Sequence, residues 1–443
     1  MNTSGPPREG VSSGPGSNGR PLRVGVLGCG NVGAALVGLL TDDSSTITAR
    51  TGVALEVAKI GVRNLSASRA VQVSAELFTR DTQAMVNDPN IDIIVETIGG
   101  IEPARALLLT ALKNGKPVIT ANKELIANCG AELFETAATA GVDLFFEAAV
   151  AGGIPVMRAL QQSLAGEQIT RIMGIVNGTT NFILTKMTEE GAAYADVLTE
   201  AQQLGYAEAD PTADVEGFDA GAKAAIIASV AFGLNVVAGD VYQEGISRIT
   251  PSDIAAAARL DHVIKLLAII ERHGDEVAVR VHPAMVPNTH PLATVRDSFN
   301  AVFIHGEAVD DLMLYGRGAG GAPTASAMLG DVLSAASNLR RGSASDPIQL
   351  KPAKVMAIDQ TSSAFYLALD VADHSGVLAE VAAVFGAYDV SIRSMEQHGV
   401  GDRARITFIT HRALEADVQA TLSGLSNLGA VHNVGAVIRV VSE

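Results

Sequence analysis

The chain of 443 residues has no tryptophan, an aromatic content of only 4%, and two cysteines, Cys29 and Cys129. Two cysteines are too few for a disulfide framework, so we expect a reducing compartment, the cytoplasm. No run reaches about 18 uninterrupted apolar residues, so we expect no membrane span and no membrane partner. Residues 1–20 are rich in Gly, Ser and Pro and lack the apolar stretch of a signal peptide, which predicts a disordered tail.

Basic residues are also in short supply. The chain has 32 Lys and Arg against 48 Asp and Glu, a formal net charge of −16. This excess of negative charge, without a basic cluster, argues against nucleic acid as a partner. What the chain has in quantity is hydrophobic residues (48%) and glycine (44 residues), which suits an α/β enzyme with two or three domains.

The first 150 residues alternate between short apolar runs and helical patterns. This alternation predicts parallel βαβ units. We expect strands at 22–27, 55–62, 91–97, 117–120 and 142–147, helices at 31–40 and 102–114, and a polar insertion at 41–52.

The pattern changes after Gly152 and predicts an α+β substrate domain. We expect strands at 169–176 and 277–287, and helices at 180–188, 194–204, 218–232, 252–273 and 323–338. Residues 340–360 are polar and irregular, which indicates a linker. The last ~80 residues start again with a strand at 365–371, and they have room for one βαββαβ module of the split-βαβ type.

A glycine-rich loop follows the first expected strand and precedes a helix. It reads Gly28-Cys-Gly30-Asn-Val-Gly33, the G-x-G-x-x-G spacing. In this context the glycines make the turn, let the backbone approach a pyrophosphate, and let the helix pack on the strand. An ordinary glycine-rich turn is the alternative, but the placement favours dinucleotide binding.

The end of the second strand bears on which dinucleotide is bound. An acidic residue usually holds the ribose 2′-hydroxyl there. Here the strand ends at Val62-Arg63-Asn64, without a carboxylate. Arg63 would suit a 2′-phosphate, which favours NADP(H), although a solvated surface arginine and NAD(H) both remain open.

The segment from Gly205 to Lys223 contains the most informative charges. Asp219 and Lys223 are four residues apart on an expected helix and so share a face. A surface ion pair is the alternative interpretation. However, Lys223 is the only charged residue between Ala220 and Leu234, and so apolar a helix is mostly buried. The pair is therefore a candidate functional site in a cleft.

The same segment resembles the signature of the homoserine dehydrogenase family, G-Y-x-E-x-D-P-x-x-D-x-x-G-x-D-x-x-x-K, at every fixed position. The resemblance extends in order from Leu22 to about Asn338 and includes the stretches 120–124, 147–155, 177–181 and 315–320. It implies an NAD(P)H-dependent oxidoreductase that interconverts L-aspartate 4-semialdehyde and L-homoserine, in the biosynthesis of threonine, methionine and isoleucine.

The resemblance also implies roles for individual residues. Lys223 would donate a proton to the carbonyl oxygen, Asp219 would orient substrate and lysine, and Lys123 would lie near both nicotinamide and substrate and share the proton transfer. A nearby ammonium would stabilise the charge that hydride delivery builds on that oxygen. The substrate-binding set is Glu208, for the amino group, with Gly205, Asp214, Gly178 and Thr179. The cofactor-binding set is Gly28, Gly30, Asn31, Val32, Gly33, Arg63, Thr97, Lys123 and Gly320.

A cation site is expected at the end of the 142–147 strand. Glu147 follows two phenylalanines, and a buried carboxylate needs a partner. An Arg or Lys partner is one possibility. The family resemblance suggests a structural sodium ion instead, held by Glu147 and the carbonyl groups of Val150, Gly152 and Ile154, oxygen ligands that suit a hard cation.

The C-terminal segment resembles the opening of an ACT domain. Asp373-His-Ser-Gly376 precedes an expected helix, and its free N–H groups would suit the charged ends of an amino acid. This implies an amino-acid effector, most simply L-threonine, bound at Asp373 and Gly376 in a homodimer or homotetramer. A purely structural dimerisation module is the alternative.

The expected division is an α/β chain with a Rossmann-type nucleotide domain and a ferredoxin-like ACT module. There are two rival functions. A dehydrogenase for another carbonyl would not explain the Glu208–Lys223 block, and a non-catalytic sensor would not explain why Lys123 and Lys223 are both present. The boundaries are a tail at 1–20, the nucleotide domain at 21–150, a catalytic and dimerisation domain at 151–322, a helix returning to the nucleotide domain at 323–340, a linker at 341–362, and the ACT module at 363–443.

Overall fold

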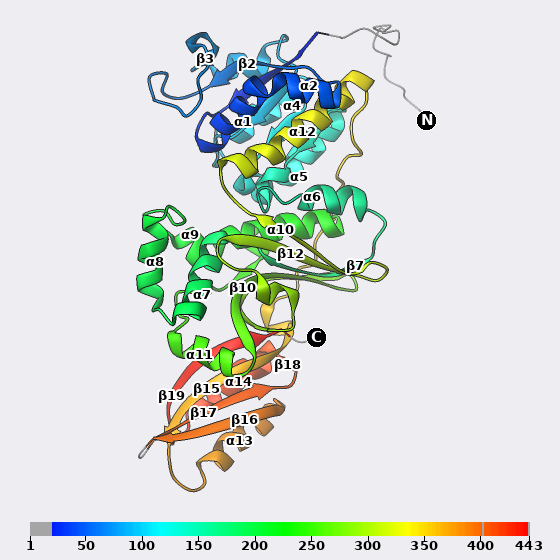
Figure 1. The fold of residues 1–443 in the computed structure, drawn as a ribbon. Coiled ribbons are helices and arrows are strands. Elements are labelled where there is room, and N and C mark those ends of the chain that lie inside the picture. The colour runs from blue at the N-terminus through cyan, green and yellow to red at the C-terminus, as the bar shows by residue number, and fades with distance from the viewer. Residues whose placement is uncertain (1–19, 401–402, 442–443) are drawn as a thin grey trace, which may run out of the picture.

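The computed structural model describes residues 20–400 and 403–441, so the expected tail at 1–20 lies outside it apart from Arg20. Three regions are stacked along the long axis of the molecule (Figure 1). The nucleotide domain is at the top, the substrate domain is in the middle, and the C-terminal module is at the bottom.

The nucleotide domain is a parallel sheet with the strand order β3-β2-β1-β4-β5-β6. The chain runs outward from β1 to β2 and β3, and then returns to continue with β4 on the other side of β1. Ligands bind at such a switch point, beyond the carboxyl ends of the strands. The strands are β1 (Leu22–Leu27), β2 (Leu55–Gly61), β3 (Phe78–Thr79), β4 (Ile93–Glu96), β5 (Val118–Thr120) and β6 (Leu144–Phe145).

Helices cover both faces of this sheet because its strands are apolar on both sides. On one face α1 (Asn31–Asp42) packs against α12 (Gly321–Arg341), which returns to this domain after the substrate domain. The other face is covered by α3 (Thr82–Asn87), α4 (Ala104–Lys113) and α5 (Lys123–Ala140). Across the described part of the chain, no helix combines the length and apolarity needed to cross a bilayer.

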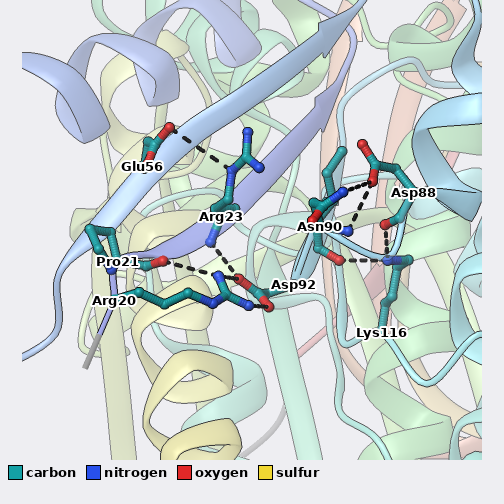
Figure 2. Close-up of polar contacts among 9 residues, drawn as sticks. Arg20, Pro21, Arg23, Glu56, Asp88, Asn90, Asp92 and Lys116 are labelled. Carbon is teal, nitrogen blue, oxygen red and sulfur yellow. Dashed lines mark hydrogen bonds and ion pairs between the residues drawn. The ribbon is translucent and has the colours of Figure 1, made fainter.

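At the amino ends of the strands, opposite the switch point, charged side chains hold the sheet together (Figure 2). Asp92 accepts hydrogen bonds from the Arg20 guanidinium, at 2.7 and 2.8 Å, and from the Arg23 amide, at 2.8 Å. The ammonium of Lys116 donates to the carbonyl groups of Asp88 and Ile91. These contacts fix the start of β1 against the loop before β4, and so fix where the nucleotide loop emerges at the other end.

The substrate domain and the C-terminal module share one continuous sheet. Its order is β13-β12-β7-β10-β11-β19-β15-β17-β16, and the two regions meet where β19 runs parallel to β11 at Ala284–Arg439 and Met285–Val440. The substrate strands are β7 (Ile169–Ile175), β10 (His262–His273), β11 (Glu276–Pro287), β12 (Phe299–Gly306) and β13 (Asp310–Arg317), with short β8 (Leu234–Asn235) and β9 (Tyr242–Gln243).

Helices of the substrate domain pack on one side of this sheet and place the site. α10 (Phe218–Phe232) contacts β10, β11 and also α5 of the nucleotide domain. It is Ala-rich and almost wholly buried, so it can approach both neighbours closely. The others are α6 (Val156–Arg158), the π-helical turn Ala159–Ser163, α7 (Gly178–Glu190), α8 (Tyr194–Gln203), α9 (Thr212–Val215) and α11 (Pro251–Arg259).

The C-terminal module has the expected βαββαβ order. Its helices cover one face of its sheet and enclose a core that includes Phe365, Phe385 and Phe408. Tyr366 and Ile438 point to the other face and belong to the core of the substrate domain. The elements are β15 (Ser362–Ala372), α13 (Val377–Ala387), β16 (Ile392–Val400), β17 (Arg403–Thr410), β18 (Ala413–Leu414), α14 (Glu415–Ser426) and β19 (Val431–Val440).

One expected element was wrong, and some others were not predicted. The expected helix at 252–273 ends at Arg259, because Asp261 adopts a positive φ of 57° and the following run enters the sheet as β10. That run is apolar at nearly every position, because the strand is buried and pairs with a neighbour on both edges. Its sequence therefore shows neither the alternation typical of a half-buried strand nor the spacing typical of an amphipathic helix. The 41–52 insertion is helical, since α1 extends to Asp42 and α2 spans Ser44–Thr51, and the β12–β13 hairpin was missed.

The segment between α12 and β15 is irregular but lies hydrogen-bonded along the molecule. Ser345 donates its amide to Asp143, and Asn338 donates its side chain to the same carboxylate. Further on, β14 (Lys351–Pro352) pairs with β8, and Val277 exchanges backbone hydrogen bonds with Lys354 and Met356. The C-terminal module is therefore joined to the body along much of this segment and not only at its ends.

The joint between module and substrate domain contains a buried ion cluster, from which a stability prediction follows. Arg439 binds Glu415 through two hydrogen bonds, at 2.7 and 2.9 Å, and Glu244 of the substrate domain at 2.8 Å. We expect Arg439→Met to destabilise the protein by about 3–5 kcal/mol, because it leaves a buried glutamate without its partner.

Thermal unfolding followed by circular dichroism measures this effect. Arg405→Met is the matched control, because its guanidinium is 41% exposed and lies 3.9 Å from Asp370. We expect the control to change stability by under about 1 kcal/mol. Equal melting temperatures for the two variants would contradict a structural role for the cluster.

Candidate active site

The glycine-rich loop lies at the switch point of the parallel sheet and is shaped for a ligand backbone or phosphate. Gly28 has a φ of 99°, and a side chain at Gly28 or Gly33 would overlap Thr97 at the end of β4. A Cβ at Gly30 would instead meet nothing within 4 Å, so this glycine faces open space. α1 begins at Asn31 and directs its free N–H groups to that space.

A buried carboxylate that sequence reasoning did not single out shapes the neighbouring loop. Glu96, the last residue of β4, is fully buried. It accepts hydrogen bonds from the amides of Ile98 and Gly99, at 2.6 and 2.9 Å, and from the Thr120 hydroxyl at 2.5 Å. It thereby fixes the loops after β4 and β5. A lone apolar-strand carboxylate was the only signal for it in the sequence.

Asp219 bridges two lysines that come from two domains. Its Oδ1 lies 2.6 Å from the Lys123 ammonium, at the start of α5, and its Oδ2 lies 2.6 Å from the Lys223 ammonium, one turn along α10. Lys223 also donates to the Val176 carbonyl at 2.8 Å. Two ammonium groups are thus held next to each other, and both can act on one polar group in front of them.

The electrostatics of this trio follow from burial and charge. Burial alone would raise the pKa of Asp219, but attraction by Lys223 and Lys123 holds that pKa well below its usual range. Burial works against the charge of Lys123 as well, yet Asp219 outweighs it and raises the pKa of Lys123. The position of Asp219 in the first turn of α10 also favours its charged form. Asp219 and Lys123 therefore stabilise each other in their charged forms.

Asn177, to which the sequence gave no role, organises the acidic side of the site. Its Nδ2 donates to Asp214 at 2.7 Å and to Asp219 at 2.9 Å, while its Oδ1 caps α7 at Thr180. Burial raises the pKa of Asp214, and its bond to Asn177 opposes that rise. Asn177 therefore holds two carboxylates side by side, and fixes the N-terminus of α7 next to them.

A cavity of about 520 Å³ opens in front of these groups, between the nucleotide and substrate domains. It brings together most of the catalytic and substrate-binding residues expected from the sequence, with Gly152 and Gly320. Its lining includes Lys123, Gly152, Gly178, Thr179, Gly205, Glu208, Asp214, Asp219, Lys223 and Gly320. The Thr179 hydroxyl donates to the Tyr206 carbonyl at 2.6 Å, which ties α7 to the Gly205 loop. The volume suits a small polar metabolite together with one end of a cofactor.

Other expected site residues lie elsewhere. Arg63 is exposed just beyond the end of β2, on the nucleotide domain but outside this cavity. Asp373 and Gly376 belong to the C-terminal module, where Gly376 has a φ of 99° at the start of α13. The module lies at the opposite end of the molecule from the nucleotide domain (Figure 1).

Glu147 is buried and lies in a cluster of its own. Its carboxylate accepts the amides of Met157 and Arg158, both at 2.8 Å, and lies 4.0 Å from the Arg158 guanidinium. Asp331 accepts the Glu147 amide and pairs with Arg158, each at 2.9 Å. Burial raises the pKa of Glu147, and it raises the pKa of Asp331 to about 7. The arginine partner considered at the outset is thus present, but it is shared between two carboxylates.

Comparisons with known families agree in three regions of the chain. The profile of the homoserine dehydrogenase NAD-binding domain matches residues 28–147, and that of the homoserine dehydrogenase family itself matches residues 155–333. The ACT domain profile matches residues 365–429. The order agrees with that of the three regions in the structure.

Individual relatives match over nearly the whole chain. The homoserine dehydrogenase of Corynebacterium glutamicum is 48% identical, over 99% of both chains, and that of Bacillus subtilis is 40% identical, over 95% of this chain and 98% of the relative. A crystal structure of a homoserine dehydrogenase from Thiobacillus denitrificans superposes with a TM-score of 0.90 at 40% identity, covering 96% of this chain and 99% of the other. A hyperthermophilic archaeal homoserine dehydrogenase in complex with NADPH superposes with a TM-score of 0.61 at 28% identity, over 74% and 100%.

The bridging carboxylate leads to a prediction about proton affinity. In Asp219→Asn we expect the pKa of Lys123 to fall, because the attraction that raises it is removed while Lys223 remains close. NMR titration of ¹³C-methylated lysines measures this. Glu124→Gln, an exposed neighbour that contributes least among the named causes, should leave the Lys123 pKa nearly unchanged. An unaltered titration in Asp219→Asn would show that Asp219 does not control the lysine.

Proposed function

The chain belongs to the homoserine dehydrogenase family of oxidoreductases, and we propose that it catalyses the reversible NAD(P)H-dependent reduction of L-aspartate 4-semialdehyde to L-homoserine. The observation that carries this proposal is the Asp219 carboxylate bridging Lys123 and Lys223 in a cavity beside the nucleotide loop. The product belongs to the route toward threonine, methionine and isoleucine. The two unpaired cysteines are consistent with work in the cytoplasm.

The roles of the residues follow from the charge that the reaction develops. A bound nicotinamide cofactor supplies or accepts the hydride. Lys223 and Lys123 stabilise negative charge on the substrate oxygen, and Lys223 delivers the proton. Asp219 holds both ammonium groups in place beside that oxygen and favours the charged form of Lys123. Glu208 attracts the substrate ammonium, and the backbone at Gly178, Thr179 and Gly205 borders the same space.

For the cofactor we propose a preference for NADP(H), with NAD(H) also used. The end of β2 offers Arg63 and no carboxylate, which suits a 2′-phosphate. The open space in front of Gly30 and the N-terminus of α1 suits the pyrophosphate, with Asn31, Val32 and Gly33 beside it. Thr97 packs against this loop and keeps its shape.

We also propose a structural sodium ion at the bend after Glu147. The cluster has two buried carboxylates and one arginine, so one further positive charge would balance the two carboxylates. Among the described residues, no hydrogen-bond donor is assigned to the carbonyl groups of Val150 and Gly152, whereas Ile154 already accepts the Val156 amide. The donor set is all oxygen, which fits sodium. The ion would order the bend that carries Gly152 into the cavity.

Regulation is proposed for the ACT domain. Its Asp373–Gly376 turn precedes α13 and offers a carboxylate next to free helix amides, apt for the two ends of an amino acid. We propose L-threonine as the effector, bound where ACT domains of two subunits meet in a homodimer or homotetramer. Because β19 continues the substrate-domain sheet, the signal would travel through that joint, and a free swing of the linker is not needed.

An assay of the wild-type chain and one variant tests the proposed activity. Aspartate semialdehyde should cause oxidation of NADPH, and more slowly of NADH. Lys223→Met should lower kcat by ~10²-fold or more, the usual scale for a positioned proton donor, with cofactor binding nearly intact.

Lys186→Met is the control, because it removes a lysine that pairs with Glu190 and Glu200 outside the cavity. Turnover like that of the wild type in Lys223→Met would place the proton elsewhere, with Lys123 the next donor to test. No aspartate semialdehyde reduction by the wild type would contradict the proposed function itself.

Isothermal titration of L-threonine into the full chain tests the regulatory proposal. Asp373→Asn should weaken binding by about tenfold or more, because a charged hydrogen bond is lost. Asp389→Asn is a matched control in the same module, since asparagine tolerates the positive φ of 56° found there. Equal binding by both variants and the wild type, or no binding of threonine at all, would reduce the module to a structural role.

A further inference from the structure

We infer that Arg317 binds the α-carboxylate of the amino-acid substrate, in the same cavity in which Glu208 would bind its ammonium. The inference rests on the proposed function, because it takes the substrate to be a zwitterion. Arg317 lies in one of the stretches that resemble the family, but the resemblance implied no role for it.

The first argument is an inventory of charge in the cavity. The lining carries three cations, Lys123, Lys223 and Arg317, and three anions, Glu208, Asp214 and Asp219. Both lysines pair with Asp219, and Asp214 is held by Asn177. Within the described ranges 20–400 and 403–441, Glu208 and Arg317 take part in no ion pair with another residue of the chain. Asp214 also forms no ion pair within these ranges, but its carboxylate is already hydrogen-bonded to the neutral Asn177 amide, so Glu208 and Arg317 are the anion and the cation left to bind an amino acid.

The second argument is that the guanidinium is held ready. It stacks on the Phe299 ring, 4.1 Å from the centroid, and its Nη1 donates to the Ser298 hydroxyl at 3.1 Å. The Phe299 ring in turn stacks on Tyr315 at 5.0 Å and 13°. Neither contact uses a carboxylate, so the remaining N–H donors are available to a ligand. A stacked guanidinium loses little freedom when it binds a carboxylate.

The backbone of Arg317 is fixed as well. It is the last residue of β13, paired with Phe299, and its carbonyl accepts the Gly153 amide at 3.0 Å. The next residue, Gly318, has no room for a side chain, because a Cβ there would overlap the buried amide of Asn300. The chain therefore turns at one defined point from β13 into the cavity wall. The side chain of Arg317 starts from a rigid base.

The geometry of recognition explains why an arginine suits this place. A carboxylate can accept two parallel N–H bonds from a guanidinium, which fixes its orientation as well as its position. With the ammonium at Glu208 and the carboxylate at Arg317, the third polar end of the substrate is left for Lys123 and Lys223. Three recognition points would also select one enantiomer.

Two truncated ligands separate the contributions. 4-Hydroxybutanoate keeps the carboxylate and lacks the ammonium, whereas 3-aminopropan-1-ol keeps the ammonium and lacks the carboxylate. Each is measured as a competitive inhibitor of L-homoserine oxidation, in wild type and in Arg317→Met. The variant should lose roughly 10- to 100-fold in kcat/KM for homoserine, mostly through KM, and a similar factor in affinity for 4-hydroxybutanoate.

The affinity for 3-aminopropan-1-ol should change less than about twofold in the same variant, because it has nothing for Arg317 to hold. Arg317→Lys should recover part of the loss. Arg296→Met is the control, since this exposed arginine pairs with Glu189 and does not line the cavity. We expect it to leave all three ligands unaffected.

Three results would overturn the assignment. Equal losses for both truncated ligands would mean that Arg317 only supports the cavity wall. A raised KM for NADPH with an unchanged KM for homoserine would assign Arg317 to the cofactor. An inactive wild type would contradict the proposed function, and the role of Arg317 would then be tested by binding alone. For this, homoserine is titrated calorimetrically into wild type and Arg317→Met. Equal binding by the two proteins, or no binding by the wild type, would contradict the role of Arg317.

Discussion

The contact between one carboxylate and two ammonium groups is the constraint on which the site depends. Asp219 is buried at the start of a nearly apolar helix, where a lone negative charge would be strongly unfavourable. Lys223 from the same helix and Lys123 from the nucleotide domain compensate it, each at 2.6 Å. The same contact joins two domains, because α5 and α10 must approach for both lysines to reach Asp219. The contact that positions these three charged groups therefore also holds the two domains together.

The chemistry of individual residues singled out side chains that lie close together in the structure, although some of the elements that carry them were not predicted. The lone lysine on an apolar helix and the family resemblance led to Lys223, Asp219, Lys123 and Glu208, which line one cavity. The glycine spacing led to the loop between β1 and α1, at the switch point of the parallel sheet. Asn177 and Glu96 were not assigned because their roles exist only across distant segments, such as the bond from Asn177 to Asp214. A neutral amide in a turn gives no sign in the sequence that it will hold two carboxylates.

The fold was predicted where local patterns are distinct and missed where they are not. The alternation of the nucleotide domain and the βαββαβ order of the ACT domain follow from short apolar runs between helices. The strand β10 was taken for a helix because its apolar run is buried on both faces, and burial removes the polar positions that would mark a period of two. The continuity of β11 with β19 could not be predicted at all, since it joins residues more than 150 positions apart.

The sheet shared by the substrate domain and the C-terminal module means that the module cannot be removed without exposing part of the substrate domain. An early stop codon would remove the C-terminal module from the chain. Here such a loss would strip β11 of its parallel neighbour at Ala284 and Met285, and would uncover the apolar surface that Tyr366 and Ile438 now share with the substrate domain. An open strand edge beside an apolar face is a template for aggregation. Loss of the ACT domain from this chain would therefore affect the folding of the substrate domain as well as any regulation.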